Sequence, residues 1–372
     1  MPVPRGITFV QGGFAKVGGI EAFAADLLFA LRSREVQAEL ICWSSNGSTA
    51  NPALVVLSKS GIRLTRSSWR WGCRWGWPDK AMVLQGWSRF ADSEILVFGK
   101  LLHPDAHRRL LSLGKRMILI TPYRPSEMWE QRRPDPAILN SFESIVVQAS
   151  FFENDLRTLG YEGRVFTLPY LPPDTLPANP WPRDARLQIG FLGRLVPDKN
   201  LDYLIVSFSR LRPMGTDAEL HLYGDGPERE TLQSLAVRLG LTAHIHFHGA
   251  LDRSQVPAAI DRCHLFAFSS TTEGQCLAAL EVLARGRPVL GTPVGAFPEF
   301  LGGLLGSIAP LHDPEAFAAA IQAMTAPVLS GELTPEEVQW AYVNRFQRRQ
   351  VIEGYLQVFG CPYSKQEETQ RV

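Results

Sequence analysis

Several common features are scarce or absent in this sequence of 372 residues. It contains five cysteines, which are scattered and form no CxxC pair, so a disulfide framework and a structural zinc site of the cysteine type are both disfavoured. No run of about 18 uncharged apolar residues occurs, and we therefore expect no membrane-spanning helix. The N-terminus lacks the pattern of a secretory signal. Together these absences predict a cytoplasmic protein.

The sequence also lacks a large excess of either positive or negative residues. Lysine and arginine number 38 and aspartate and glutamate 37, which gives a net charge of +1. Residues 1–169 nevertheless carry 21 basic and 15 acidic residues. Ordinary solvated faces would explain this imbalance, and so would contact with an anionic surface or acceptor. Charge alone therefore identifies no partner. Hydrophobic residues make up 45% and charged residues 20%, a composition typical of a soluble globular enzyme.

Strand-like and helix-like segments alternate along the whole chain. Residues 6–11 and 38–43 have the apolar character of strands, and residues 19–32 between them place apolar side chains at helical spacing. The same alternation resumes in residues 187–192 and 218–223. This order is typical of a parallel sheet with helices on both faces. We therefore predict an α/β protein with two doubly wound, Rossmann-like domains and a cleft at the carboxyl ends of their strands.

A proline-rich segment separates the two series. Six prolines occur in residues 169–182, and proline removes a backbone donor and keeps the chain extended. We interpret this segment as the linker between domains. The predicted boundaries are residues 1–172 for the first domain, 183–345 for the second, and 346–372 for a terminal helix and tail.

Two cations follow the first strand of the second domain. Ile189 to Gly193 is an apolar strand that ends in glycine, and Arg194 and Lys199 come directly after it, before the next helix. A diphosphate is well matched by about two positive charges together with the amides of a helix start. A surface loop with ordinary charges is the alternative, but the strand before and the helix after this loop favour an anion site.

Two carboxylates lie eight positions apart around a later junction between loop and helix. Glu273 follows an apolar strand, and Glu281 is about one turn into the helix that begins near Cys276. Each acid alone would more often be structural, Glu273 as a helix-start acid and Glu281 as a buried, paired one. Carboxylates accept hydrogen bonds from sugar hydroxyls, so the acids and the two cations together describe a pocket for a nucleotide-sugar.

These segments resemble the donor-site signature of retaining GT-B glycosyltransferases of the GT4 type, also called glycosyltransferase group 1. Residues 193–199 match the element GR-x-x-P-x-K position for position, and residues 273–281 match the E-x7-E motif. The resemblance implies that Arg194 and Lys199 contact the donor diphosphate, that Glu281 accepts the ribose hydroxyls and that Glu273 contacts the transferred hexose. It also implies that backbone amides hold the hexose and the phosphates, namely those of Gly274, Gln275, Cys276 and Leu277.

This chain departs from the family at two of these positions. The family often has an apolar residue at the place of Gln275 and glycine or proline at that of Cys276, which leaves the identity of the sugar open. Residues 222–228 resemble the family's strand-to-helix G-x-GP turn. The same run lacks the third glycine of a dinucleotide fingerprint, which disfavours a dehydrogenase.

The resemblance reaches the first domain in outline. Gly18 and Gly19 form a glycine loop before the first long helix, and in GT4 enzymes this loop closes over the donor phosphates or the reaction centre. Many relatives place a histidine after the strand that ends at Ile120, where Tyr123 is the counterpart here and Arg124 is adjacent. Lys100 ends another strand and either faces the cleft or is a solvated strand end. The terminal residues 346–372 are expected to cross back to the first domain.

The segment 69–77 contains four tryptophans that alternate with two arginines. An acceptor-binding platform that includes Trp75 and Trp77 is the first functional interpretation, a membrane-interface patch the second, and a nucleic-acid stacking surface a distant third. Packing of the tryptophans against the domain core is the structural alternative. We expect no nucleic-acid partner.

The resemblance implies a retaining hexosyltransferase that moves a hexose from a UDP- or GDP-linked sugar to an acceptor hydroxyl. The acceptor would be a small molecule, a glycan or a lipid-linked compound, bound on the side of the first domain. The matched segments contain no DxD-like element, so we expect no metal and no other cofactor. The alternatives are a nucleotide-sugar 2-epimerase on the same fold and a non-catalytic nucleotide-sugar-binding module. The expected location is the cytoplasm, either with or without peripheral contact with a membrane.

Overall fold

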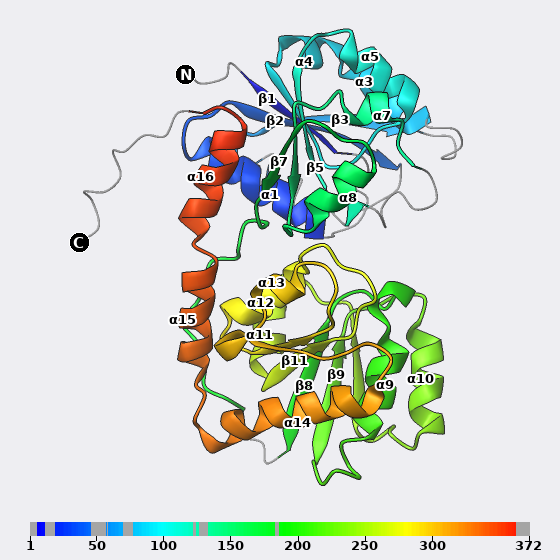
Figure 1. Cartoon of the computed structure of the whole chain (residues 1–372), viewed down its shortest axis with the longest axis vertical. Helices are drawn as coiled ribbons and strands as arrows, with labels where there is room; N and C mark the ends of the chain where they lie inside the picture. Colours follow the sequence, from blue (N-terminus) through cyan, green and yellow to red (C-terminus); the bar gives the residue numbers. More distant parts are fainter. Residues whose placement is uncertain are drawn as a thin grey trace, which may run out of the picture. The chain divides into compact units, whose positions relative to one another are not determined.

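The computed structural model describes residues 6–11, 19–45, 57, 59–69, 77–121, 124–125, 133–182 and 186–361. The chain divides into two compact units (Figure 1). The first comprises Met1–Leu171 together with Arg349–Val372, and the second comprises Pro172–Arg348. In the described part of the chain, no helix has both the length and the apolar character needed to cross a membrane.

The first unit contains a seven-stranded sheet in the order β3-β2-β1-β4-β5-β6-β7, in which every neighbouring pair is parallel. Its strands are β1 (Ile7–Gln11), β2 (Ala38–Ser45), β3 (Arg63–Trp69), β4 (Ile95–Phe98), β5 (Arg116–Ile120), β6 (Ser144–Val147) and β7 (Arg164–Thr167). Its helices are α1 (Gly19–Arg32), α3 (Trp77–Gln85), α4 (Trp87–Asp92), α5 (Pro104–Leu111), α7 (Pro136–Leu139), α8 (Phe152–Thr158) and α16 (Arg348–Val358). Strands β1, β4 and β6 are buried along their whole length because helices cover both faces of a parallel sheet.

The second unit repeats this architecture with six parallel strands in the order β10-β9-β8-β11-β12-β13. Its strands are β8 (Leu187–Leu192), β9 (Ala218–Tyr223), β10 (Ile245–Gly249), β11 (Leu265–Phe268), β12 (Val289–Gly291) and β13 (Gly306–Ile308). Its helices are η1 (Pro197–Lys199), α9 (Leu201–Ser209), α10 (Arg229–Arg238), α11 (Val256–Asp261), α12 (Leu277–Ala284), α13 (Phe297–Phe300), η2 (Gly303–Leu305), α14 (Pro314–Ser330) and α15 (Pro335–Arg345). Two doubly wound sheets confirm the predicted fold class.

The last helix, α16, packs on the first unit. The ring of Tyr355 lies 5.5 Å from that of Phe23 in α1, and its hydroxyl donates to the carbonyl oxygen of Pro169 at 3.1 Å. Phe359, just past the helix, meets Phe9 of β1 edge-on at 6.1 Å. A terminal helix that follows the second sheet in sequence therefore completes the core of the first unit, which confirms the predicted crossover.

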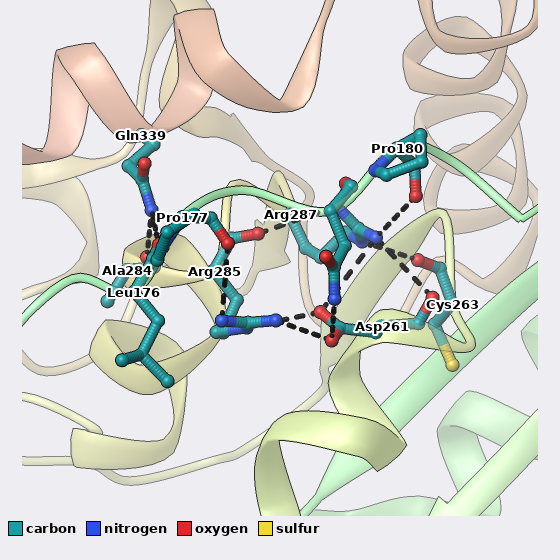
Figure 2. A network of polar contacts seen from close by, with 10 residues as sticks. Leu176, Pro177, Pro180, Asp261, Cys263, Ala284, Arg285, Arg287 and Gln339 are labelled. Carbon is teal, nitrogen blue, oxygen red and sulfur yellow. Dashed lines mark hydrogen bonds and ion pairs between the residues drawn. The ribbon is translucent and has the colours of Figure 1, made fainter.

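The proline-rich segment is held against the second unit by arginine side chains (Figure 2). Arg287 is fully buried and donates to the carbonyl oxygens of Asn179 at 2.9 Å and Pro180 at 3.0 Å. Its guanidinium also lies over the ring of Trp181. Gln339 of α15 donates to the carbonyl oxygen of Leu176 at 2.7 Å. A segment rich in proline offers many acceptors and few donors, so side chains from elsewhere must supply the hydrogen bonds.

Candidate functional site

The strand order of the second sheet points to one location for a ligand. Strand β8 lies between β9 and β11, and the chain winds outward from it in both directions. In open parallel sheets, ligands bind at the carboxyl ends of the strands where the winding direction changes. The loop 193–200 follows β8 and the loop 269–276 follows β11, so the two segments singled out by their charges border the switch point of this sheet.

Backbone contacts hold these two loops together. The amide of Thr271 donates to the carbonyl oxygen of Asp198 at 3.0 Å. The hydroxyl of Ser269 donates to the carbonyl oxygens of Lys199 at 2.9 Å and Asn200 at 3.0 Å. Asn200 has the left-handed conformation, with φ 51° and ψ 44°, and directly precedes α9. The basic loop is thus fixed on the acidic loop at three points.

Two glycines after β9 support the basic loop from its other side. The amide of Gly193 donates to the carbonyl oxygen of Tyr223 at 2.9 Å, and that of Leu195 donates to the carbonyl oxygen of Asp225 at 3.0 Å. A Cβ atom at Gly224 would overlap the carbonyl oxygen of Gly193, and one at Gly226 would overlap that of Leu195. The two glycines of the G-x-GP turn are therefore required by close backbone packing beneath the loop that carries Arg194.

Lys199 and Glu273 form a buried ion pair at the switch point. Their Nζ and Oε1 atoms lie 2.8 Å apart, and the side chains are only 14% and 6% exposed. Ser270 donates to the same carboxylate oxygen at 2.8 Å, and a carboxylate oxygen of Asp198 lies 3.5 Å from Nζ. Burial acts to lower the pKa of Lys199, but the combined effects of its neighbours, with the charge of Glu273 first among them, outweigh it and raise this pKa above its usual value. The structure thus brings Lys199, which is predicted to bind the diphosphate, into contact with Glu273, which is predicted to bind the hexose.

Arg194 differs from Lys199 in its surroundings. Its side chain is exposed and forms no hydrogen bond or ion pair with the residues that the structure describes. It begins the loop at the carboxyl end of β8, so its charge is available to an anion at the switch point. A guanidinium that is not engaged by the protein can bind two phosphate oxygens at once.

The loop that leads into α12 has a constrained backbone. Cys276 is in the left-handed region, with φ 58° and ψ 81°, a conformation that costs a residue with a side chain more than it costs glycine. Burial, followed by the charge of Glu273, raises the pKa of the Cys276 thiol well above its usual value, so the thiol stays protonated. The amide of Ala296, after β12, donates to the carbonyl oxygen of Gly274 at 2.7 Å. Gln275 is buried, and Leu277 begins α12.

Glu281 lies one turn into α12 and is half-buried. Burial raises the pKa of Tyr342 in α15, and the charges of Asp174 and Glu281 add to this effect, so the carboxylate of Glu281 lies within electrostatic reach of that phenol. The two acids of the E-x7-E pattern therefore have different surroundings. Glu273 is paired with a lysine in the core of the site, whereas Glu281 lies on the helix that follows.

Two predicted acceptor-side cations are paired within the first unit. Lys100 lies 3.3 Å from a carboxylate oxygen of Asp79. Arg124 donates from two nitrogens to Asp155, at 2.7 and 3.2 Å, and its guanidinium lies over the ring of Phe151. Gly19 is the first residue of α1, and Trp77 is the first residue of α3, where only its backbone is described. Gly18, Trp75 and Tyr123 lie outside the described residues.

Gln11 of the first unit was missed by the sequence reasoning. It ends β1 at the switch point between β1 and β4, is almost fully buried, and lies so close to Gly99 that a Cβ there would overlap its side-chain oxygen. Gln11 and Gly99 line a small pocket with Phe23 and Tyr170. A glutamine at the carboxyl end of a mostly apolar strand was the available signal.

Comparison with known proteins finds similarity in the second unit to one family. Residues 186–326 match the family model described as Glycosyl transferases group 1. The GDP-mannose-dependent alpha-(1-6)-phosphatidylinositol monomannoside mannosyltransferase of Mycolicibacterium smegmatis is 34% identical over 138 residues, which cover 35% of this chain and 36% of the relative. The lipopolysaccharide core biosynthesis glycosyltransferase LpsE of Rhizobium meliloti is 32% identical over 179 residues, which cover 48% and 50%. The matches therefore span half or less of these relatives.

The solved structures extend the likeness to both units. Sucrose-phosphate synthase from Thermosynechococcus elongatus superposes with a TM-score of 0.77 and 16% sequence identity, over 96% of this chain and 98% of that one. At this identity the likeness concerns the fold. Both units therefore share the fold of that protein, and the family model matches residues of the second unit alone.

Proposed function

We propose that this chain, whose residues 186–326 match the Glycosyl transferases group 1 family, is a retaining hexosyltransferase that uses a nucleoside-diphosphate sugar. The observation that carries the proposal is the position of the Lys199–Glu273 pair. It lies at the switch point of the second sheet, between a loop with an exposed arginine and the start of α12. This arrangement offers positive charge to a diphosphate and a carboxylate to sugar hydroxyls within one site.

The ion pair suggests how the donor is received. In this structure Glu273 neutralises Lys199, so neither charge is buried alone. When a donor binds, the ammonium of Lys199 turns to the diphosphate and the carboxylate of Glu273 accepts hydrogen bonds from the hexose. Exposed Arg194 adds the second positive charge. Binding thus replaces the Lys199–Glu273 ion pair by contacts of both residues with the donor, and neither buried charge is left without a partner.

The transfer step follows from these roles. The bond between the anomeric carbon and the diphosphate oxygen breaks, and negative charge grows on the departing diphosphate. Arg194, Lys199 and the first amides of α12 stabilise that charge. The acceptor oxygen bonds to the anomeric carbon on the face that the diphosphate leaves, and the acceptor proton passes to a diphosphate oxygen. This route retains the configuration and uses neither a protein nucleophile nor a metal ion.

The relatives guide the choice of substrates to test. The names of the two relatives given above refer to a phosphatidylinositol monomannoside and to a lipopolysaccharide core. We therefore place a glycan or lipid-linked acceptor first, bound on the side of the first unit, with the protein in the cytoplasm and in peripheral contact with a membrane. The donor is a UDP- or GDP-linked hexose, and GDP-mannose is the first to test because one relative is named for it.

The experiment combines a donor screen with two substitutions. Purified protein is incubated with labelled UDP- and GDP-hexoses, with and without lipid-linked and glycan acceptors, and products are identified by mass spectrometry. We expect transfer, with slow hydrolysis of the donor when no acceptor is present. Epimerisation of the donor, or recovery of bound but unchanged donor, would contradict transferase activity.

The substitutions test the site itself. Arg194→Ala and Glu281→Ala should each lower kcat/KM by at least about 100-fold, the usual effect of removing a group that stabilises developing charge or orients the donor. The exposed residues Arg238 and Glu230 of α10 provide matched controls, since their replacement by alanine removes the same charge elsewhere in the same unit. Near-normal transfer by both site variants, with folding confirmed by circular dichroism, would refute the assignment.

A further inference from the structure

A cluster of histidines occupies one face of strands β9 and β10. Side chains alternate between the faces of a strand, so Glu219 and His221 of β9 share a face, as do His246 and His248 of β10. The register pairs His246 with His221 across the two strands. Leu220, between Glu219 and His221, is fully buried on the opposite face. The cluster therefore results from the register of two parallel strands, at the edge of the sheet where β10 is the last strand.

Three of these side chains converge on one point. The rings of His221 and His246 are stacked, with centroids 4.9 Å apart and planes inclined by 17°. Nε2 of His246 lies 3.2 Å from Oε2 of Glu219. One ligand atom from each of Glu219, His221 and His246 lies within 4.8 Å of the other two, and in the described part of the chain no other group of three such residues meets this condition.

Two further observations distinguish this group from an ordinary polar surface. Nε2 of His246 is buried and has no hydrogen-bond partner, because its approach to Glu219 lacks the geometry of a hydrogen bond. The outer contacts of the group are also fixed. Arg186 donates to Oε1 of Glu219 at 2.5 Å, and Gln188 lies 2.6 Å from Nε2 of His221. Such outer partners orient the ligands of metal sites.

We propose that Glu219, His221 and His246 bind a divalent transition-metal ion, with Zn²⁺ as the preferred occupant. Two imidazoles and one carboxylate are ligands typical of zinc, at bond lengths of about 2.0–2.1 Å. Tetrahedral bonds of that length separate ligand atoms by about 3.4 Å, so side chains with ligand atoms within 4.8 Å of one another close on the ion by shifts of about 1 Å. His221 binds the ion through one ring nitrogen. It then loses its contact with His248 if that nitrogen is Nδ1, or with Gln188 if it is Nε2.

The site is partly open, so an ion can enter. The side chain of His246 is 38% exposed and that of Glu219 is 18% exposed. His248 is exposed, and its Nε2 lies 2.9 Å from Nδ1 of His221, where it offers a fourth nitrogen. The ion joins β10 to β9 and stabilises the edge of the sheet. The charged loops of the proposed sugar transfer follow β8 and β11, whereas the three zinc ligands lie on β9 and β10.

The test uses the full chain, expressed without a polyhistidine tag and dialysed against a chelator. Zinc chloride is titrated by calorimetry at neutral pH and, for tight binding, in competition with a chromophoric chelator. We expect one zinc ion per chain with micromolar or tighter affinity. His246→Gln and Glu219→Gln should each weaken binding by at least about 10-fold, since even the loss of an outer partner of a metal ligand has that effect.

His244→Gln is the matched control, because His244 lies just before β10 and outside the group of three. Zinc should also raise the melting temperature of the wild-type chain and of this control but not that of His246→Gln. Circular dichroism of the zinc-free proteins checks that each variant folds. Absence of stoichiometric binding, or equal affinity of the wild type and both site variants, would overturn the proposal.

Discussion

The buried pair of Lys199 and Glu273 allows a sharp test of the site without any ligand. In Lys199→Met the carboxylate of Glu273 keeps the hydroxyl of Ser270 but loses its cation at 2.8 Å. In Glu273→Gln the ammonium of Lys199 keeps Asp198 at 3.5 Å. In the double variant both buried charges are gone and Ser270 can still donate to the amide oxygen. The three proteins therefore differ in whether a charge remains buried and unpaired.

The expected magnitudes follow from burial. At an effective dielectric constant of about 20, two charges 2.8 Å apart attract each other by about 6 kcal/mol, and the loss of hydration offsets much of this. Removing only one partner leaves the other desolvated, which typically costs about 3–5 kcal/mol. We expect Lys199→Met to lower the free energy of unfolding of the second unit by that amount, Glu273→Gln to lower it less, and the double variant to be more stable than Lys199→Met.

Hydrogen exchange measures the change in stability within the second unit itself. The amides of β8 are buried in the second sheet, so their exchange under native conditions reports the opening of that unit. Protection of β8 should fall most in Lys199→Met and recover in part in the double variant. A double variant that is as unstable as Lys199→Met, or less stable, would refute the argument that the unpaired carboxylate causes the loss.

Three further predictions concern groups outside this pair. Arg287→Leu should lower the free energy of unfolding by about 3–5 kcal/mol, measured in urea, because it removes a fully buried guanidinium that donates to the carbonyl oxygens of Cys263, Asn179 and Pro180. Gly224→Ala should cost at least about 2 kcal/mol in the same assay, because the methyl group would overlap the carbonyl oxygen of Gly193 at a φ of +139°. Burial lowers the pKa of His107 to about 4, so the unfolded chain, with a histidine pKa of about 6.5, binds the proton more readily. The contribution of neutral His107 to the free energy of unfolding should therefore be fully present above pH 6.5. It should fall by about 3 kcal/mol as the pH drops from about 6.5 to 4, and His107→Gln should largely remove this loss.

Each of these predictions has a control. Arg287→Lys should recover only part of the loss, since an ammonium cannot reproduce the fork of donors. Gly215→Ala also places alanine at a positive φ, of +83°, but its methyl group would meet no atom within 4 Å, so it should cost less than Gly224→Ala. If wild type and His107→Gln lost stability in parallel between pH 6.5 and 4, another group would control the acid transition.

Much of the fold could be predicted from local patterns. The alternation of apolar strands with helical periodicity indicated two doubly wound sheets, because the period of apolar residues reports which elements form. The spacing of Arg194 and Lys199 after one strand, and of Glu273 and Glu281 around another helix start, identified the segments of the candidate site. These signals are short-range, and each depends on fewer than about twenty consecutive residues.

The contacts within the site could not be predicted in the same way. Lys199 and Glu273 are 74 residues apart, and they meet only because β8 and β11 are neighbours in the sheet. The sequence shows Gly224 and Gly226 as part of a turn motif, whereas they are required because they pack on the backbone of Gly193 and Leu195, 31 residues earlier. Cysteine spacing could not indicate the pairing of His221 with His246, which belong to different strands.

The sequence by itself therefore determined which segments become strands and helices and which loops carry the charges, since these follow from side-chain periodicity and composition. The tertiary structure alone decided which charges are paired, why the glycines are required, how the proline-rich segment is held, and which histidines face one another. These properties depend on strand order and register, through which residues far apart in the chain come within a few ångströms of each other.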